Sequence, residues 1–115
     1  MARFLFVYRG GEDHKLTPDE MQENMQKWGN WIREALKQGW MVDPGDALTP
    51  EGRVVNAKKV VTDGPFVESK EIVGGFSIVE AATIDAAAQH AKGCPGLLVG
   101  GKVEVRALAG LAAQL

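Results

Sequence analysis

The sequence predicts a single α+β domain whose elements follow the order strand, helix, strand, strand, helix, strand. Two segments carry helix-capping signals, and the stretches around them are rich in β-branched and aromatic residues. The segment near the C-terminus alternates apolar and charged residues, as a strand covered on one face does. The 115 residues suit one domain and contain no linker, so the domain is predicted to span residues 1–115.

Residues 3–9 are predicted to form the first strand. Successive side chains of a strand point to opposite faces, so three aromatic residues share one face: Phe4, Phe6 and Tyr8. Leu5 and Val7 lie on the other face. Because both faces are apolar, we expect a central strand that is covered on both sides.

The first helix is predicted over residues 18–38. Thr17 and Glu20 form a capping box, in which each side chain accepts the backbone N–H of the other residue. Gly39 stands where a helix end favours a left-handed conformation. Apolar residues recur at helical spacing, and we expect them on one buried face: Met21, Met25, Trp28, Ile32, Ala35 and Leu36.

Short strands and turns are predicted after this helix. Residues 40–43 resemble a brief extended segment, and the sequence Asp-Pro-Gly-Asp at 43–46 is typical of a turn. Residues 53–55 and 59–62 are predicted to pair as a hairpin.

The second half of the chain predicts a strand, a helix and a strand. Residues 72–81 form the first of these, and the adjacent Gly74 and Gly75 indicate a bulge or a close backbone approach. Thr83 caps the helix, which continues to about residue 90 or 92. Residues 102–108 alternate cleanly, with Val103, Val105 and Ala107 on one face and Lys102, Glu104 and Arg106 on the other.

This element order is the βαββαβ, ferredoxin-like pattern, here with an extra hairpin. In that architecture both helices cover one face of the sheet and leave the other face open. Leu5 and Val7 would lie on the open face, and an exposed apolar face of that size calls for a partner. We therefore expect a homodimer that forms through the sheet face.

Composition disfavours several classes of function. The net charge is −2 and the longest basic run is Lys58-Lys59, which argues against nucleic acid as a partner. No apolar run approaches the roughly 20 residues of a membrane span. A lone cysteine, Cys94, fits a reducing compartment, so we expect a cytoplasmic protein. No cofactor motif is present, and His14 and His90 are too few and too far apart to predict a metal site.

One stretch carries a family resemblance. Residues 62–71, Thr-Asp-Gly-Pro-Phe-Val-Glu-Ser-Lys-Glu, followed by Gly74-Gly75-Phe76, resemble the signature of the YCII-related family in its DGPF branch. The first strand, the helix that leads to Gly39, and Cys94-Pro95 before the last strand fall where that family has similar elements.

The resemblance implies a ferredoxin-like fold of the dimeric α+β barrel kind and small-molecule enzyme chemistry. As an alternative, it implies a link between DGPF members and extracytoplasmic-function sigma factors. Related YCII proteins have a histidine in the first helix and a nearby aspartate as a proposed dyad. The first helix of this chain has no histidine and reads Lys-Trp-Gly-Asn-Trp at residues 27–31, so that dyad is not expected here.

Asp63 and His14 are the candidate catalytic residues. Asp63 precedes Gly-Pro at a strand end, where its carboxylate either caps a turn or projects into a cleft as an acid or base. His14 could act as an acid or base near neutral pH, but a lone loop histidine among charged residues is more often plain surface.

Six further residues are candidates for ligand binding. Lys70 and Glu71 belong to a mixed-charge run that either is solvated or covers a pocket, with Lys70 holding an anionic group. Arg9 could hold a carboxylate, and Trp31 lies one position off the helix stripe, at a pocket rim or in a dimer contact. Tyr8 and Phe66 complete the set.

Two functions follow from these candidates. The first is a small-molecule enzyme or binding protein for a small anionic or cyclic ligand, with a cleft between the sheet and residues 63–71. The second is a non-catalytic dimeric partner of a transcription regulator. An enzyme should show a closed, partly apolar pocket that Asp63, Tyr8 or Glu71 enters, whereas an interaction module should show a flat exposed patch around the tryptophans.

Overall fold

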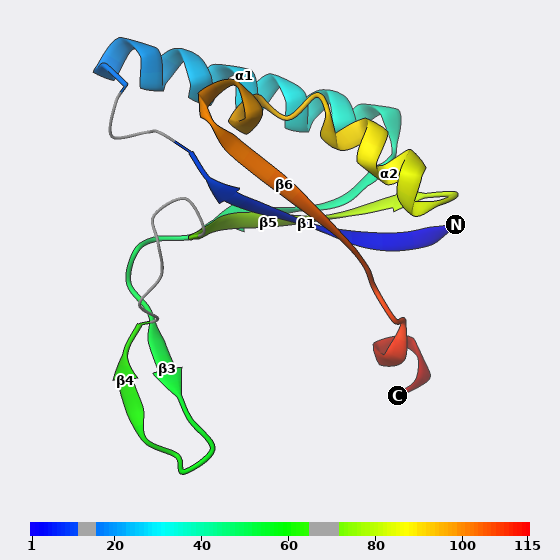
Figure 1. Cartoon of the computed structure of the whole chain (residues 1–115). Helices are drawn as coiled ribbons and strands as arrows, with labels where there is room; N and C mark the ends of the chain where they lie inside the picture. The colour runs from blue at the N-terminus through cyan, green and yellow to red at the C-terminus, as the bar shows by residue number, and fades with distance from the viewer. Residues whose placement is uncertain (12–15, 65–71) are drawn as a thin grey trace.

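The computed structural model describes residues 1–11, 16–64 and 72–115. Four strands form one antiparallel sheet in the order β2-β5-β1-β6, with bounds β1 Ala2–Gly10, β2 Met41–Ala47, β5 Val73–Ala81 and β6 Gly101–Ala107. Two α-helices, α1 (Pro18–Gln38) and α2 (Ile84–Ala91), lie on the same side of this sheet (Figure 1). This order and layering agree with a ferredoxin-like α+β fold.

The core lies between the sheet and the helices. Phe6 is fully buried and pairs across β1 and β5 with Ser77, which is also fully buried. Phe4 pairs with Val79 in the same layer, and Ala35 of α1 belongs to the same buried cluster. The prediction that the aromatic face of β1 meets the helices is therefore confirmed for Phe4 and Phe6.

The opposite face of β1 carries Leu5 and Val7, as predicted. Leu5 pairs with Ile78 of β5 and with Arg106 of β6, so these three side chains lie on the same face of the sheet. The predicted alternation of β6 is confirmed, because Val105 pairs with the core residue Phe6. Both α-helices lie on the other side of the sheet, so neither packs on this second face (Figure 1).

The signals that bound α1 act as predicted. The Thr17 hydroxyl accepts the Glu20 N–H at 3.1 Å, and the Glu20 carboxylate accepts the Thr17 N–H at 3.1 Å. Gly39 takes a left-handed conformation with φ 87°. The predicted buried stripe is wrong at both ends, because Met21 is 43%, Met25 71% and Leu36 43% exposed. Leu36 lies in the last turn of α1, and the two methionines lie in its first half. These methionines face a cavity at the end of the sheet instead of packing on the core.

β2 is longer than predicted, because the turn-like residues 43–46 remain in the strand. Its pairing with β5 shifts register on either side of Asp43, and Gly45 takes a left-handed conformation with φ 64°. The Asp43 carboxylate accepts the Gly45 N–H at 2.8 Å, a local bond that supports this irregular backbone. Turn chemistry here bends a strand instead of ending it.

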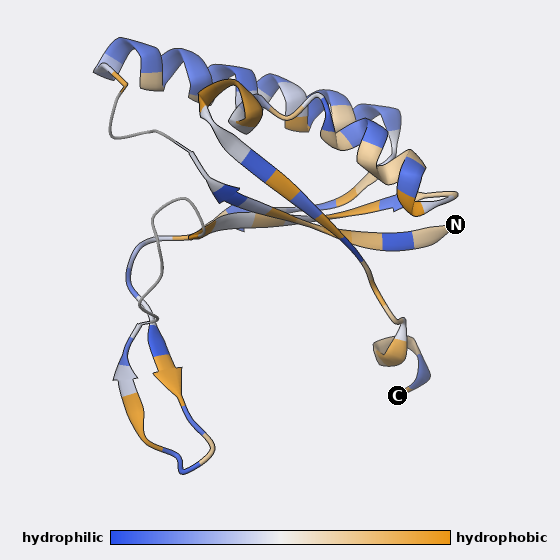
Figure 2. Ribbon diagram, in the orientation of Figure 1, coloured by the Kyte–Doolittle hydropathy of each residue, from blue (hydrophilic) through white to orange (hydrophobic). Residues whose placement is uncertain are grey.

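A separate hairpin of β3 (Arg53–Val55) and β4 (Val61–Asp63) projects from the side of the sheet opposite the helices (Figure 1). Its second strand starts later than predicted, because Lys59 has φ 65° and remains in the loop. Hydrophobic residues appear on both of its strands (Figure 2). Val55 pairs with Val61, and both are about 60% exposed, at 63% and 59%.

The remaining described elements are two short 3₁₀ helices, Pro95–Val99 and Leu111–Gln114, for which no element was predicted. The first connects α2 to β6, and the second ends the chain on the same side of the sheet as the hairpin (Figure 1). In the described parts of the chain, no helix is both long and apolar enough to cross a bilayer.

Candidate functional site

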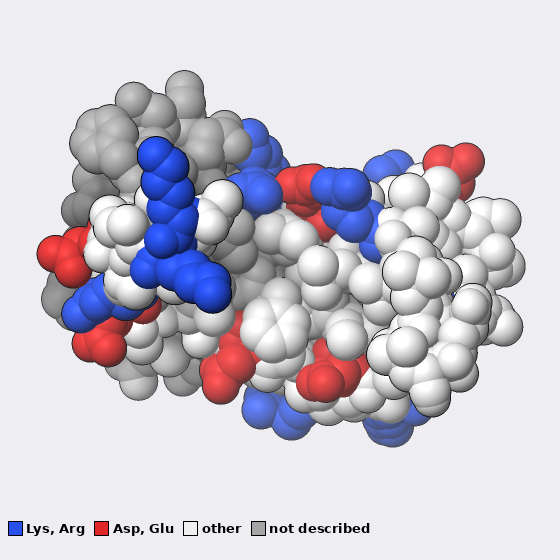
Figure 3. Space-filling model, turned by 90° about the horizontal axis from the view of Figure 1, so that it is seen from below, with Lys and Arg blue, Asp and Glu red and all other residues white. Residues whose placement is uncertain are grey.

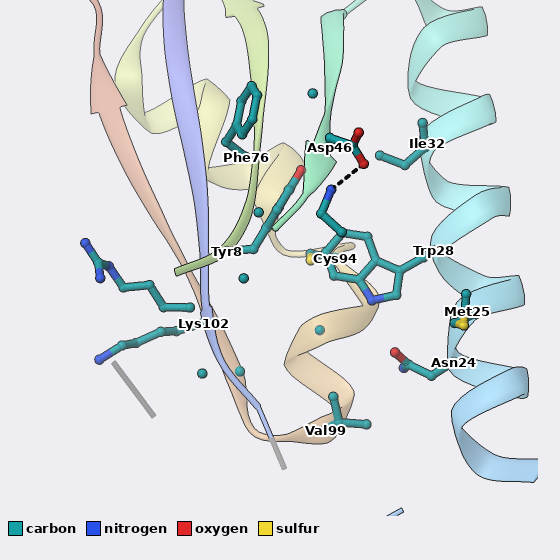
Figure 4. A pocket seen from close by; sticks show the side chains of 18 of the residues that line it. Tyr8, Asn24, Met25, Trp28, Ile32, Asp46, Phe76, Cys94, Val99 and Lys102 are labelled. Carbon is teal, nitrogen blue, oxygen red and sulfur yellow. Dashed lines mark hydrogen bonds between the residues drawn. The ribbon is translucent and has the colours of Figure 1, made fainter. Parts of the chain in front are cut away.

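A cavity of about 560 Å³ lies between α1, the 3₁₀ helix 95–99 and the adjoining end of the sheet. Figure 4 shows Tyr8 on the sheet side and Trp28, Met25 and Asn24 on the helix side of this space. Most lining side chains are apolar, and the cavity is partly open to solvent. Its volume falls within the range typical of sites for small organic molecules.

Glycines allow the backbone segments around this cavity to approach closely. A Cβ atom on Gly45 would lie 1.9 Å from the Phe76 carbonyl oxygen, and one on Gly75 would lie 2.8 Å from the Asp46 carbonyl oxygen. Both distances are shorter than any real Cβ contact, so only glycine fits without a backbone shift. The close approach predicted for the paired glycines of β5 is confirmed.

A chain of hydrogen bonds runs along the sheet side of the cavity. The Tyr8 hydroxyl donates to Ser77 Oγ at 2.7 Å, and Ser77 Oγ donates to the Pro44 carbonyl oxygen at 2.7 Å. Burial raises the pKa of Tyr8 well above its ordinary value, although the bond to Ser77 opposes this effect. Tyr8 is therefore a neutral phenol throughout the physiological pH range.

Aromatic rings support the wall that Tyr8 and Trp28 form. Their ring centroids are 4.8 Å apart in an edge-to-face arrangement, and Trp31 lies 5.8 Å from Trp28. Trp40 continues the cluster and stacks on His90 at 4.2 Å. All three tryptophans are half-buried and pack inward, so the described residues show no flat exposed tryptophan patch.

Three charged residues line the cavity. Asp46 lies near Ile32, and its carboxylate accepts the Ala47 N–H at 2.8 Å (Figure 4). Arg9 donates to Glu104 at 2.8 Å, and the Lys102 side chain is directed away from α1 (Figure 4). Hydrogen bonds, first from Arg9 and then from Arg106, hold the pKa of Glu104 below its usual range. Arg9 and Lys102 pair across β1 and β6 on the same face as Leu5, so these cations belong to the side of the sheet opposite α1.

A family model described as the YCII-related domain matches residues 2–109 of the chain. The chain belongs to this family. No curated protein matches it significantly. Because the match covers nearly the whole chain, the sheet, both helices and the cavity all belong to the YCII-related domain.

The YCII-related domain brings only some of the predicted site residues together. Tyr8 and Arg9 line the cavity. Trp31 packs behind Trp28 in the aromatic cluster and is not among the lining residues. Asp63 lies on β4 of the hairpin, where its side chain is 97% exposed and pairs with Arg53 at 3.7 Å. The structure therefore does not bring Asp63 into this cavity.

Four predicted residues lie outside the described part of the chain: His14, Phe66, Lys70 and Glu71. Within the described part, no group of three or more histidine, cysteine or acidic side chains is arranged to hold a metal ion.

The cavity also contains polar residues that the sequence did not single out. Asp46 was interpreted only as part of a turn, and Asn24 lies on α1, where its amide donates to the Pro95 carbonyl oxygen at 3.2 Å. Ser77 is the one polar residue among the fully buried ones described. The available signal was a serine between apolar neighbours, Phe76 and Ile78, because a buried hydroxyl requires partners.

Cys94 lines the cavity as a protonated thiol. It is buried, and this burial raises the pKa of the thiol to about 11, although backbone N–H groups of Gly96 and Leu97 oppose the effect. A thiolate is the reactive form of cysteine, so the folded protein presents an inert side chain at neutral pH.

We expect iodoacetamide to modify Cys94 very slowly in the native protein at pH 8 and rapidly in denaturant. Because the folded thiol keeps its proton up to pH about 11, the folded state binds more protons than the unfolded state at alkaline pH. The free energy of unfolding should therefore fall as the pH rises above the ordinary thiol pKa, and Cys94→Ala should weaken that dependence. Rapid native alkylation at pH 8, followed by mass spectrometry, would contradict this account.

Proposed function

We propose that this YCII-related domain binds a small cyclic organic molecule in the cavity between α1 and the end of the sheet. The supporting observation is a cavity of ligand size whose wall is mainly apolar, with a few polar groups from Tyr8, Asn24 and Asp46. Trp28 and Met25 offer a ring edge and a thioether to a flat ligand, both of which favour aromatic partners.

Asp46 is the group we assign to acid–base chemistry on such a ligand. It supplies the carboxylate among the described lining residues, whereas Asp63 faces solvent on the hairpin. Arg9 and Lys102 lie on the opposite face of the sheet, so we assign no anion-binding role in this cavity to them. The sequence Asp63-Gly64-Pro65-Phe66 supports assignment to the DGPF branch of the family.

A thermal-shift screen of cyclic acids tests the proposal with three forms of the protein. A compound that binds should raise the melting temperature of the wild type, since ligands that bind only the folded state stabilise it. Ala47→Trp should abolish that increase, because Ala47 is exposed on the cavity wall and a bulky side chain there occupies the binding space. Asp63→Asn should respond like the wild type.

The control for this screen is the melting temperature of each variant without compound. Equal stabilisation of the wild type and Ala47→Trp would show that the compound binds outside the cavity. An increase in melting temperature that is lost only in Asp63→Asn would show that the compound binds at the hairpin. Either result would contradict the proposal.

We further propose that two copies of the chain pair through the open sheet face. Leu5, Val7 and Ile78 lie on this face and are only half-buried in one chain. Ion pairs flank them, Arg3 with Glu80 at 3.2 Å and Arg9 with Glu104 at 2.8 Å.

Figure 3 shows this side of the molecule, where uncharged atoms form a broad area and acidic and basic side chains lie close together along its edges. A two-fold axis through such a face would bury these apolar residues against their copies, and the flanking residues offer both signs of charge to a second copy, which supports that copy as the occupant.

A further inference from the structure

The hydrogen bonds beside the cavity have a fixed direction. The Pro44 carbonyl oxygen can only accept, so the single proton of the Ser77 hydroxyl must lie in the 2.7 Å contact between them. Ser77 must then accept in its other 2.7 Å contact, which commits the single proton of the Tyr8 hydroxyl. Ser77 is fully buried, so no bulk water competes for these bonds.

Tyr8 consequently has lone pairs but no proton to offer to a ligand. Its oxygen can accept one more hydrogen bond, and its ring lines the cavity beside Trp28. Burial keeps the phenol neutral, so its oxygen does not become a phenolate that would attract a cation. The Asp46 carboxylate also accepts a hydrogen bond, from the Ala47 N–H, and it lies on the same sheet side of the cavity as Tyr8 (Figure 4).

The third polar lining group, Asn24, offers both kinds of hydrogen bond. One N–H of its amide donates to Pro95, which fixes the orientation of the amide and leaves its carbonyl oxygen as an acceptor and its second N–H as a donor. Arg9 and Lys102 lie on the opposite face of the sheet. The sheet side of the cavity, around Tyr8 and Asp46, is therefore rich in acceptors, whereas the N–H donors of Asn24 and Trp28 belong to the helix side.

We propose that the ligand is a cyclic compound that presents an N–H or O–H donor to the Tyr8 oxygen. This inference rests on the proposed function, because it names the chemical class of ligand for the same cavity. A ring with only ether or carbonyl oxygens at that point would set lone pairs against lone pairs. The hydrogen bond from Ser77 to Pro44 thus determines which ligands Tyr8 can bind, although Ser77 itself does not line the cavity.

Indole and benzofuran form a matched pair for the test, because they differ in the N–H that benzofuran replaces with oxygen. Benzofuran is the more apolar compound, so burial alone would favour it. Dissociation constants are measured at pH 7 from chemical shifts of the Gly75 and Cys94 amides in ¹⁵N-labelled protein. We expect the wild type to bind indole about tenfold more tightly than benzofuran, the effect of one well-placed hydrogen bond.

Two variants separate the hydrogen bond from packing. Tyr8→Phe removes the acceptor oxygen but leaves the Ser77–Pro44 bond. It should weaken the binding of indole, so that indole binds no more tightly than benzofuran. Ser77→Ala frees the Tyr8 proton to point into the cavity, so it should favour benzofuran relative to the wild type.

Equal binding of both compounds to the wild-type cavity would overturn the donor inference and leave the proposed function standing. A preference for indole that survives in Tyr8→Phe would overturn it as well. If neither compound shifts the cavity amides at millimolar concentration, the proposed function and this inference both fail.

Discussion

Replacing Gly45 with alanine is expected to lower the free energy of unfolding by about 3 kcal/mol or more. Gly45 has φ 64°, which costs a residue with a side chain about 1–2 kcal/mol. Its Cβ would also lie 1.9 Å from the Phe76 carbonyl oxygen, so β2 and β5 would have to separate. Since both strands line the cavity, ligand binding should be lost along with stability.

Two control glycines separate the cost of the backbone conformation from the cost of the steric clash in this experiment. Gly39 has φ 87°, but no atom lies within 4 Å of the point that a Cβ would occupy, so Gly39→Ala should cost only the strain, about 1 kcal/mol. Gly52 has open space and no positive φ, so Gly52→Ala should be nearly neutral. Urea denaturation followed by far-UV circular dichroism gives the three values. Equal losses for Gly45→Ala and Gly39→Ala would contradict the close approach of β2 and β5.

Replacing Leu5 with glutamate is expected to convert a dimer into monomers. Leu5 lies on the open sheet face, half-buried between Ile78 of β5 and Arg106 of β6. In one chain a glutamate there faces solvent near an arginine, so the fold should survive. In a face-to-face dimer the same carboxylate would be buried twice near the two-fold axis, which costs several kcal/mol per buried charge.

Sedimentation equilibrium on the wild type and two variants measures this effect. The wild type should have about twice the chain mass of 12.4 kDa, and Leu5→Glu should have the mass of a single chain. Gln26→Glu makes the same change of charge on exposed α1, which covers the other face, and should remain dimeric. A wild type that sediments as one chain at high concentration would contradict pairing through the sheet.

Features encoded by neighbouring residues could be predicted from the sequence. Thr17 and Glu20 are three residues apart, so their reciprocal hydrogen bonds depend only on the helix that they start. The left-handed Gly39 and the alternation of β6 are local in the same sense. These signals sufficed for the order of elements and therefore for the class of fold.

Features that depend on contacts between distant segments could not be predicted. Whether Asp43-Pro44-Gly45-Asp46 turns or bends depends on β5, which pairs with it from more than 30 residues away. The helical spacing of Met25 predicted that its side chain is buried, but the structure leaves it exposed. Periodicity shows which residues share a helix face, and it does not show whether strands lie beneath that part of the helix.

The candidate site shows the same division. Tyr8 was a candidate on the helix-facing side of the first strand, and the structure confirms that it lines the cavity. Asp63 drew attention through its motif, but the hairpin that carries it projects away from the sheet (Figure 1). Asp46 and Ser77 acquire their roles only once β2, β5 and β1 are assembled.

Chemical-shift mapping with indole on ¹⁵N-labelled wild-type protein tests the central claim most directly, because it reports where a cyclic compound binds. The account predicts that the largest shifts cluster at residues that line the cavity from three elements, Tyr8, Gly75 and Cys94. Saturable shifts confined to the hairpin or to the Trp40–His90 stack, with those three amides unmoved, would contradict it.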